Sequence, residues 1–119
     1  MSEINKRMES LNRVELIGFV GAANVNKVGD TQVVRFSVAT NYGYKDKYEN
    51  AVVETTWHNV VAWEGEKVSK ETIAKIKKYE QVKVVGRIRQ YRFTNADGSE
   101  RTGYEIVANE VSVTGAKLF

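Results

Sequence analysis

The 119-residue sequence contains no cysteine and no proline, and it has a single histidine, His58. Without cysteine, neither a disulfide nor a thiolate metal site can form. A lone histidine is more often a hydrogen-bonded structural residue or a subunit contact than a catalytic base, and we expect this of His58. The carboxylates are scattered without the spacing of a calcium loop. The sequence therefore predicts no metal and no cofactor.

Long apolar runs and phosphate-binding motifs are also missing. No window approaches the roughly 18 to 20 apolar residues of a membrane-spanning helix, and the first ten residues, MSEINKRMES, lack the apolar core of a secretion signal. Neither GxxxxGK[ST] nor GxGxxG occurs. We expect a cytoplasmic protein with no membrane partner, and because no catalytic constellation is present, we expect it not to be an enzyme.

Charge is distributed unevenly along the chain. The net charge is only +3, from 18 basic and 15 acidic residues, which is too weak a field to identify a polyanion partner. Residues 83–93, however, contain four cations and no acidic residue, whereas residues 64–80 mix five lysines with four glutamates. The first segment indicates a basic patch and the second a solvated helix face.

The periodicity of the apolar residues predicts five strands and one helix. The strands are expected at residues 12–20, 31–40, 54–63, 81–93 and 102–114, where apolar, β-branched and aromatic residues alternate with polar ones. Helical spacing covers residues 68–79, with Ser69 as N-cap. Asp97 and Gly98 are expected to supply the positive φ angles of a tight turn between the last two strands.

This order of elements is typical of the oligonucleotide-binding (OB) barrel, an all-β fold with five strands and a helix between strands 3 and 4. A small mixed α+β sheet shares the same order and stays an alternative. No repeat, linker or low-complexity tract marks an internal boundary. We expect one domain at residues 12–115, an N-terminal extension at 1–11 and a short C-terminal end at 116–119.

Three segments supply the aromatic rings and cations that a protein that binds unpaired nucleotides requires. They are the loop expected at residues 42–48 (YGYKDKY), the two tryptophans six residues apart on one strand, and the strand GRIRQYRF at 86–93. In an OB barrel all three would flank one groove. The candidate nucleic-acid contacts are Tyr44, Lys45, Lys47, Trp57, Trp63, Arg87, Arg89, Tyr91, Arg92 and Phe93.

Each segment also has an ordinary structural explanation. A strand tryptophan is often a core residue because large rings dominate buried area. Arginines on an exposed strand can simply prevent edge-to-edge aggregation, and tyrosines in a loop can pack across its base. The presence of aromatic rings in all three segments, with cations in two of them, favours the binding interpretation.

The segments NRVELIGFVG, VRFSVAT, ETTWHNVVAW and QVKVVGRIRQYRF, followed by the ADGSERTGYEIV hairpin, resemble the bacterial single-stranded DNA-binding protein family. The resemblance covers residues 12–115 and implies an OB-fold subunit that assembles, usually as a tetramer and otherwise as a dimer, and wraps single-stranded DNA with little sequence preference. It places base stacking on Tyr44, Trp57, Trp63 and Phe93 and DNA-contacting charges on Lys47 and Arg92. It places His58 near a subunit interface.

The resemblance implies binding and protection of single-stranded DNA in replication, recombination or repair, in the nucleoid of a bacterial cell. Two alternatives remain: an accessory OB module of the primosome type that mainly contacts other replication proteins, and a small barrel enzyme that cleaves nucleic acid with a metal. The family typically continues into a linker and an acidic tip that recruits partners. This sequence has no acidic residue after Glu110, so it is either a tail-less form or a piece of a longer chain, and recruitment of replication or repair proteins is left open.

Overall fold

The computed structural model describes residues 10–118. The elements are β1 (Val14–Val28), β2 (Thr31–Lys45), β3 (Ala51–Trp63), α2 (Lys70–Lys75), β4 (Glu80–Thr94) and β5 (Glu100–Lys117). The predicted order of strands and helix is confirmed. Most of the predicted N-terminal extension, residues 1–9, lies outside the described residues.

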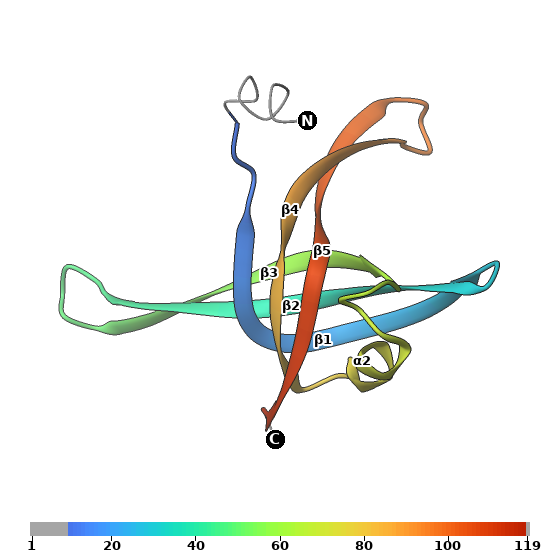
Figure 1. Ribbon diagram of the computed structural model, residues 1–119. Coiled ribbons are helices and arrows are strands. Elements are labelled where there is room, and N and C mark those ends of the chain that lie inside the picture. Colours follow the sequence, from blue (N-terminus) through green and yellow to red (C-terminus); the bar gives the residue numbers. More distant parts are fainter. Residues whose placement is uncertain (1–9, 119) are drawn as a thin grey trace.

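The five strands close into a barrel in the order β1-β2-β3-β5-β4, which confirms the predicted OB-type fold (Figure 1). Neighbouring strands are antiparallel except for β3 and β5, which meet in parallel. Only two residue pairs make this last contact, Val60 with Ile106 and Val61 with Val107. The barrel is therefore closed by a short seam, while its other strand pairs are long.

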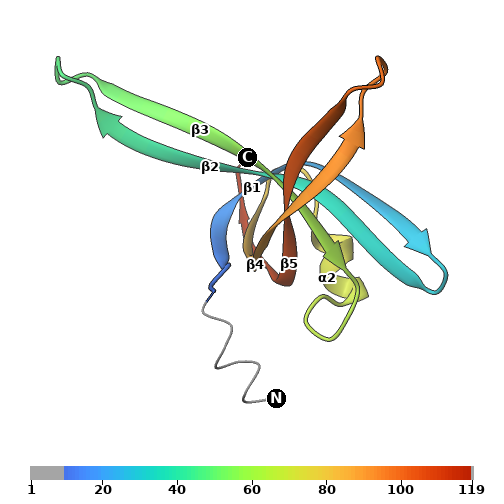
Figure 2. The same cartoon turned by 90° about the horizontal axis from the view of Figure 1, so that it is seen from above.

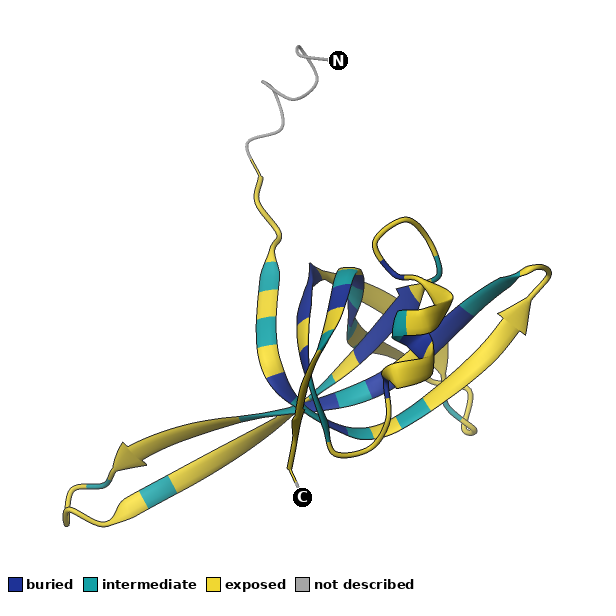
Figure 3. Ribbon diagram, turned by 60° about the horizontal axis from the view of Figure 1, so that its bottom comes forward, coloured by how far each residue is buried: buried dark blue, intermediate teal, exposed yellow. Residues whose placement is uncertain are grey.

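Alternating residues of the strands fill the barrel interior. Val34, Phe36 and Val38 of β2 are at most 4% exposed, and Val82 and Val84 of β4 are fully buried. The period of two predicted for residues 31–40 is confirmed, because side chains of a strand point to opposite faces. Figure 3 shows the buried residues gathered where the strands cross.

The helix is shorter than the predicted span of residues 68–79. Ser69 caps it as predicted, accepting a hydrogen bond from the Thr72 backbone N–H at 3.1 Å. The helix ends at Lys75 because Ile76 takes an extended conformation and the backbone N–H of Tyr79 donates to the carbonyl of Val20 on β1. Tertiary hydrogen bonding thus replaces the last predicted turns. Within residues 10–118, no helix is both long and apolar enough to cross a membrane.

The strands are longer than predicted, because three hairpins project from the barrel. The β2–β3 and β4–β5 hairpins extend away from each other as long arms (Figures 1 and 2). Residues on both faces of these arms are mostly exposed (Figure 3), so their sequences lack the alternation that marks a half-buried strand. Residues 42–45, predicted as part of a loop, belong to β2, and only residues 46–50 form the turn.

The β4–β5 turn differs from the prediction in its backbone. Gly98 has a positive φ of 88°, but Asp97 is not among the residues with positive φ. The Asp97 carboxylate instead accepts hydrogen bonds from the backbone N–H of Ser99 at 2.9 Å and from its hydroxyl at 2.6 Å. Both hydrogen bonds hold the pKa of Asp97 below its ordinary value, and the bond from the Ser99 hydroxyl has the larger effect. Asp97 therefore stabilises the turn through its side chain.

Candidate nucleic-acid interface

Trp57 lies on the outer face of β3 and is 60% exposed. Its indole lies against the backbone of Gly21 on β1, where an added Cβ would come within 2.4 Å of the ring. A glycine therefore gives the ring room to lie close to the strand. One side of the indole is supported by the barrel wall and the rest is open to solvent, which leaves a platform for a flat ligand.

Trp63 occupies the far end of β3 and is 44% exposed. β3 runs without a break from Ala51 to Trp63 and pairs continuously with β2, so the even spacing places both indoles on one face, as predicted. Six residues of strand separate them by roughly 20 Å. Both predicted tryptophan platforms are thus outside the core.

Two further rings lie on the β4–β5 arm, Tyr91 nearer the barrel and Phe93 next to the turn. Tyr91 is 40% exposed and Phe93 is 45% exposed, with their ring centroids 6.0 Å apart. Tyr91 pairs with Gly103 of β5, and a Cβ on that glycine would lie 2.5 Å from the tyrosine ring. Like Trp57, Tyr91 packs over a residue without a side chain, and this fixes the plane of its ring.

One carboxylate joins two arginines beside these rings. Glu105, whose side chain is only 11% exposed, accepts from Arg89 through Oε1 and from Arg35 Nη1 through Oε2 at 3.3 Å. The cluster therefore ties the β4–β5 arm to β2. Two guanidinium groups against one carboxylate leave one net positive charge, and each guanidinium keeps further N–H donors.

The other two arginines of the predicted patch are held loosely. Arg92 lies 3.9 Å from Glu100, and both side chains are more than two-thirds exposed, so this pair contributes little in water. Arg87 is exposed and has no ion-pair partner within residues 10–118. Both guanidinium groups can turn toward a phosphate.

The remaining predicted residues lie at the tip of the β2–β3 arm. Tyr44 is 44% exposed and its ring centroid lies 6.0 Å from that of Tyr42. Lys45 pairs with Glu49 at 3.7 Å on the surface, and Lys47 Nζ lies 5.1 Å from the ring centroid of Tyr48. The tip therefore presents rings and ammonium groups together, as its sequence predicted.

Asp46 organises this tip. Its carboxylate accepts hydrogen bonds from the backbone N–H of Tyr48 at 2.8 Å and of Asn50 at 3.0 Å. The Asn50 backbone bond is the largest cause that holds the pKa of Asp46 below its ordinary value of 3.8. The charged form of the carboxylate thus fixes the turn that carries Lys47.

His58 is hydrogen-bonded across the β2–β3 pair, with Nε2 2.8 Å from the Thr40 hydroxyl oxygen. It is half-buried and lies on the face opposite Trp57. A structural hydrogen bond was one of the two roles predicted for it, and the subunit contact stays a prediction. In the described part of the chain, no three histidine or carboxylate side chains gather where they could hold a metal ion.

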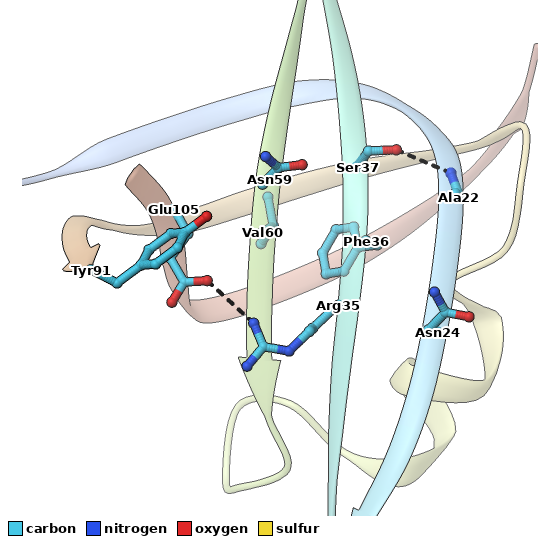
Figure 4. Close-up of a pocket in the computed structure, with 9 residues that line it drawn as sticks. All are labelled: Ala22, Asn24, Arg35, Phe36, Ser37, Asn59, Val60, Tyr91 and Glu105. Atoms are coloured by element: carbon cyan, nitrogen blue, oxygen red, sulfur yellow. Dashed lines mark hydrogen bonds and ion pairs between the residues drawn. The ribbon is translucent and has the colours of Figure 1, made fainter. Parts of the chain in front are cut away.

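A hollow of about 300 Å³ lies between the outer face of β1–β3 and the base of the β4–β5 arm (Figure 4). Tyr91 and Glu105 line it from the arm, and Arg35 and Asn59 line it from β2 and β3. On β3, Asn59 lies between the two tryptophans. A nucleic-acid strand that passed along this face of β3 would therefore cross the hollow.

The structure gathers some predicted residues and separates others. Tyr91 and Arg89 lie together at the base of the β4–β5 arm, and Trp57 lines a neighbouring hollow with Ile88 of that arm. Lys47 and its neighbours are on the β2–β3 arm, which points away from the β4–β5 arm (Figure 2). The structure therefore does not bring the three predicted segments into a single groove.

Sequence reasoning missed four contributors to this surface: Arg35, Glu105, Gly21 and Gly103. Arg35 could have been found, because it is the one charge within the alternating segment TQVVRFSVAT. Nothing in the sequence pairs Gly21 with Trp57, since that contact depends on the register of three strands. The same holds for Gly103 under Tyr91.

Comparison with known proteins agrees with this arrangement. The model of the single-strand binding protein family matches residues 11–114. The single-stranded DNA-binding protein of Neisseria meningitidis is 36% identical over 110 residues, which are 91% of this chain and 62% of that protein. Single-stranded DNA-binding protein 1 of Xylella fastidiosa is 37% identical over 114 residues, covering 92% of this chain and 82% of the relative. The chain thus spans less than two thirds of the Neisseria protein.

A solved structure of the SSB of Plasmodium falciparum in complex with ssDNA superposes with a TM-score of 0.73 at 28% identity. The match covers 89% of this chain and 95% of that one. The fold, the family model and the relatives agree over the whole barrel, and the chain belongs to the single-strand binding protein family.

Proposed function

We propose that this chain binds single-stranded DNA with little sequence preference, through base stacking on exposed rings and phosphate contacts to lysines and arginines. The observation that carries the proposal is the exposure of Trp57 and Trp63 on the barrel surface and of Phe93 on the β4–β5 arm, at 44% to 60%. Large rings are normally buried in a core. Arginines lie beside Phe93 on β4, and Arg35 lies on β2, the strand that pairs with β3. The relatives are named single-stranded DNA-binding proteins.

Base stacking and phosphate contacts would make separate contributions to DNA binding. Unpaired bases stack on aromatic rings with roughly 1 to 3 kcal/mol per base, whatever the base, which makes the binding tolerant of sequence. Arg87 and Arg92 are free to turn toward phosphates, and Lys47 at the other arm can meet the strand further along. Release of counterions makes such contacts sensitive to salt.

The proposal includes three further features. The chain acts without catalysis, because binding and protection of a single strand in replication, recombination or repair need no reaction. It works inside the bacterial cytoplasm at the nucleoid. It assembles with copies of itself, as a tetramer or a dimer. The accessory primosome-type role is less well supported, because the relatives are named single-stranded DNA-binding proteins.

Fluorescence anisotropy of a labelled oligo-dT, titrated with the protein at several salt concentrations, tests the proposal. Binding should be tight at low salt, and log K should fall linearly with log[salt], by about 0.7 per phosphate contact. Unlabelled single strands should compete, and a duplex of equal length should compete far less. The proposal fails if no complex forms at low salt, or if duplex competes as well as single strand.

A further inference from the structure

Four polar side chains form two cross-strand pairs on the outer face of β1–β3. Asn24 pairs with Arg35, and Ser37 pairs with Asn59. Since Arg35 and Ser37 are two residues apart on β2, both pairs lie on the same face. All four line the hollow of about 300 Å³, and Tyr91 stands at its side (Figure 4).

These groups keep hydrogen-bonding capacity for a ligand. The side-chain amides of Asn24 and Asn59 have no partner within residues 10–118. Ser37 Oγ accepts from the backbone N–H of Ala22 at 3.1 Å, which leaves its own O–H to donate. Arg35 uses Nη1 for Glu105, and its other N–H groups stay available.

The hydrogen-bonding preference of the hollow depends on which of its groups can both donate and accept. The Arg35 guanidinium can only donate, whereas the Ser37 hydroxyl and the two asparagine amides can donate or accept. The acceptor atoms of Glu105 are already used by Arg35 and Arg89. Among the residues that line the hollow, Arg35 therefore has a fixed polarity as a donor, and a ligand that enters the hollow needs an acceptor atom opposite its guanidinium.

The shape of the hollow suits one flat ring. Its volume lies at the lower end of the roughly 300 to 1,000 Å³ of small-molecule sites. Tyr91 supplies an aromatic side whose ring plane is fixed by the contact with Gly103. On β3, Asn59 lies between Trp57 and Trp63. A single-stranded DNA whose bases stack on both indoles therefore passes directly over the opening of the hollow.

We propose that this hollow is a subsite for one nucleobase that carries a carbonyl oxygen, which Arg35 and Ser37 bind while Tyr91 supports the ring. Thymine, cytosine and guanine have such an oxygen, whereas adenine offers only ring nitrogens as acceptors and has an amino group that, like the guanidinium, is a donor. Glu105 is a positioning residue that aims the Arg35 guanidinium. The inference rests on the proposed function and adds one base-reading position to binding that is otherwise tolerant of sequence.

The test compares oligo-dT and oligo-dA of equal length on the wild-type protein and on Arg35→Lys. Lysine keeps the positive charge but loses the planar fork of donors. Affinity for oligo-dT should fall about 3- to 10-fold, the effect of one or two lost hydrogen bonds. Affinity for oligo-dA should change less than about twofold, and the salt dependence should stay the same because no charge is lost.

Arg13→Lys is the matched control, because Arg13 is exposed, lies outside the hollow and forms its one ion pair among residues 10–118 with Glu15. It should leave both affinities unchanged. Ser37→Ala should also weaken oligo-dT more than oligo-dA. Equal losses on both strands would make Arg35 a plain phosphate contact and overturn the subsite, as would no loss on either. Failure of the wild-type protein to bind oligo-dT would instead overturn the proposed function itself.

Discussion

At the scale of single residues, two of the open rings of this surface depend on glycines beneath them. Trp57 lies on Gly21 and Tyr91 lies on Gly103, and in each case an added Cβ would come within 2.5 Å of the ring. The sequence predicted which residues carry rings and cations. It could not predict that these rings are held outside the core, because the supporting glycines belong to other strands.

Gly21→Ala is expected to weaken DNA binding without unfolding the barrel. The new Cβ would meet the exposed Trp57 indole, which can swing away but then loses the position in which it stacks. We expect a loss of about 1 to 3 kcal/mol in binding to oligo-dT, the contribution of one stacked base. Titration and thermal unfolding of the same variant measure both effects.

Gly18→Ala is the contrasting control. Its Cβ would lie 2.2 Å from the backbone carbonyl oxygen of Ala39, which cannot move without disturbing the sheet. This variant should lose thermal stability first. If Gly21→Ala binds oligo-dT like the wild type, the ring-on-glycine platform is wrong.

At the scale of elements, the predictable parts were those that bury one face. The alternation of β2 and the Ser69 cap of α2 could be read from the sequence, because each follows from local chemistry. The outer halves of the strands could not be predicted from the sequence, because the arms expose both faces and their residues do not alternate. The end of α2 depends on the bond between the Tyr79 N–H and the carbonyl of Val20, a contact that no local pattern encodes.

The tip of the β2–β3 arm should loosen at low pH. Asp46 accepts backbone hydrogen bonds from Asn50 and Tyr48, which lower its pKa below 3.8. Because the folded pKa is the lower one, this stabilisation is present above pH 3.8 and is lost as the pH falls through the folded value. The amide resonances of Tyr48 and Asn50 should therefore shift together in an NMR titration, with a midpoint below 3.8.

Asp46→Asn should abolish this titration and leave the Asp97 turn at the end of the other arm unchanged. A midpoint at or above 3.8 would contradict the role given to the carboxylate.

At the scale of the whole molecule, the projecting hairpins give the chain an open shape. The radius of gyration is 17.2 Å, whereas a compact domain of this length has roughly 13 to 14 Å. Isolated two-stranded hairpins are only marginally stable in water. Apolar side chains such as Ile88 and Tyr104, which are 48% and 63% exposed, add surface that further copies of the chain could cover.

The proposed self-association predicts the mass of the protein in solution. We expect a tetramer in solution, with a mass near 54 kDa, four times the 13.5 kDa of one chain. A dimer of 27 kDa, twice that mass, would still fit the proposed assembly. Sedimentation equilibrium at micromolar concentration measures this mass directly. A monomer at every concentration would contradict the self-association.

The central claim is that the exposed indoles receive unpaired bases, and the intrinsic fluorescence of two variants tests it most directly. Trp57→Phe leaves Trp63 as the only tryptophan of the chain, and Trp63→Phe leaves Trp57. The account predicts that saturating oligo-dT quenches the emission of each remaining indole, because each stacks with a base. If oligo-dT binds but the tryptophan emission of neither variant changes, the DNA runs elsewhere on the barrel and the central claim is contradicted.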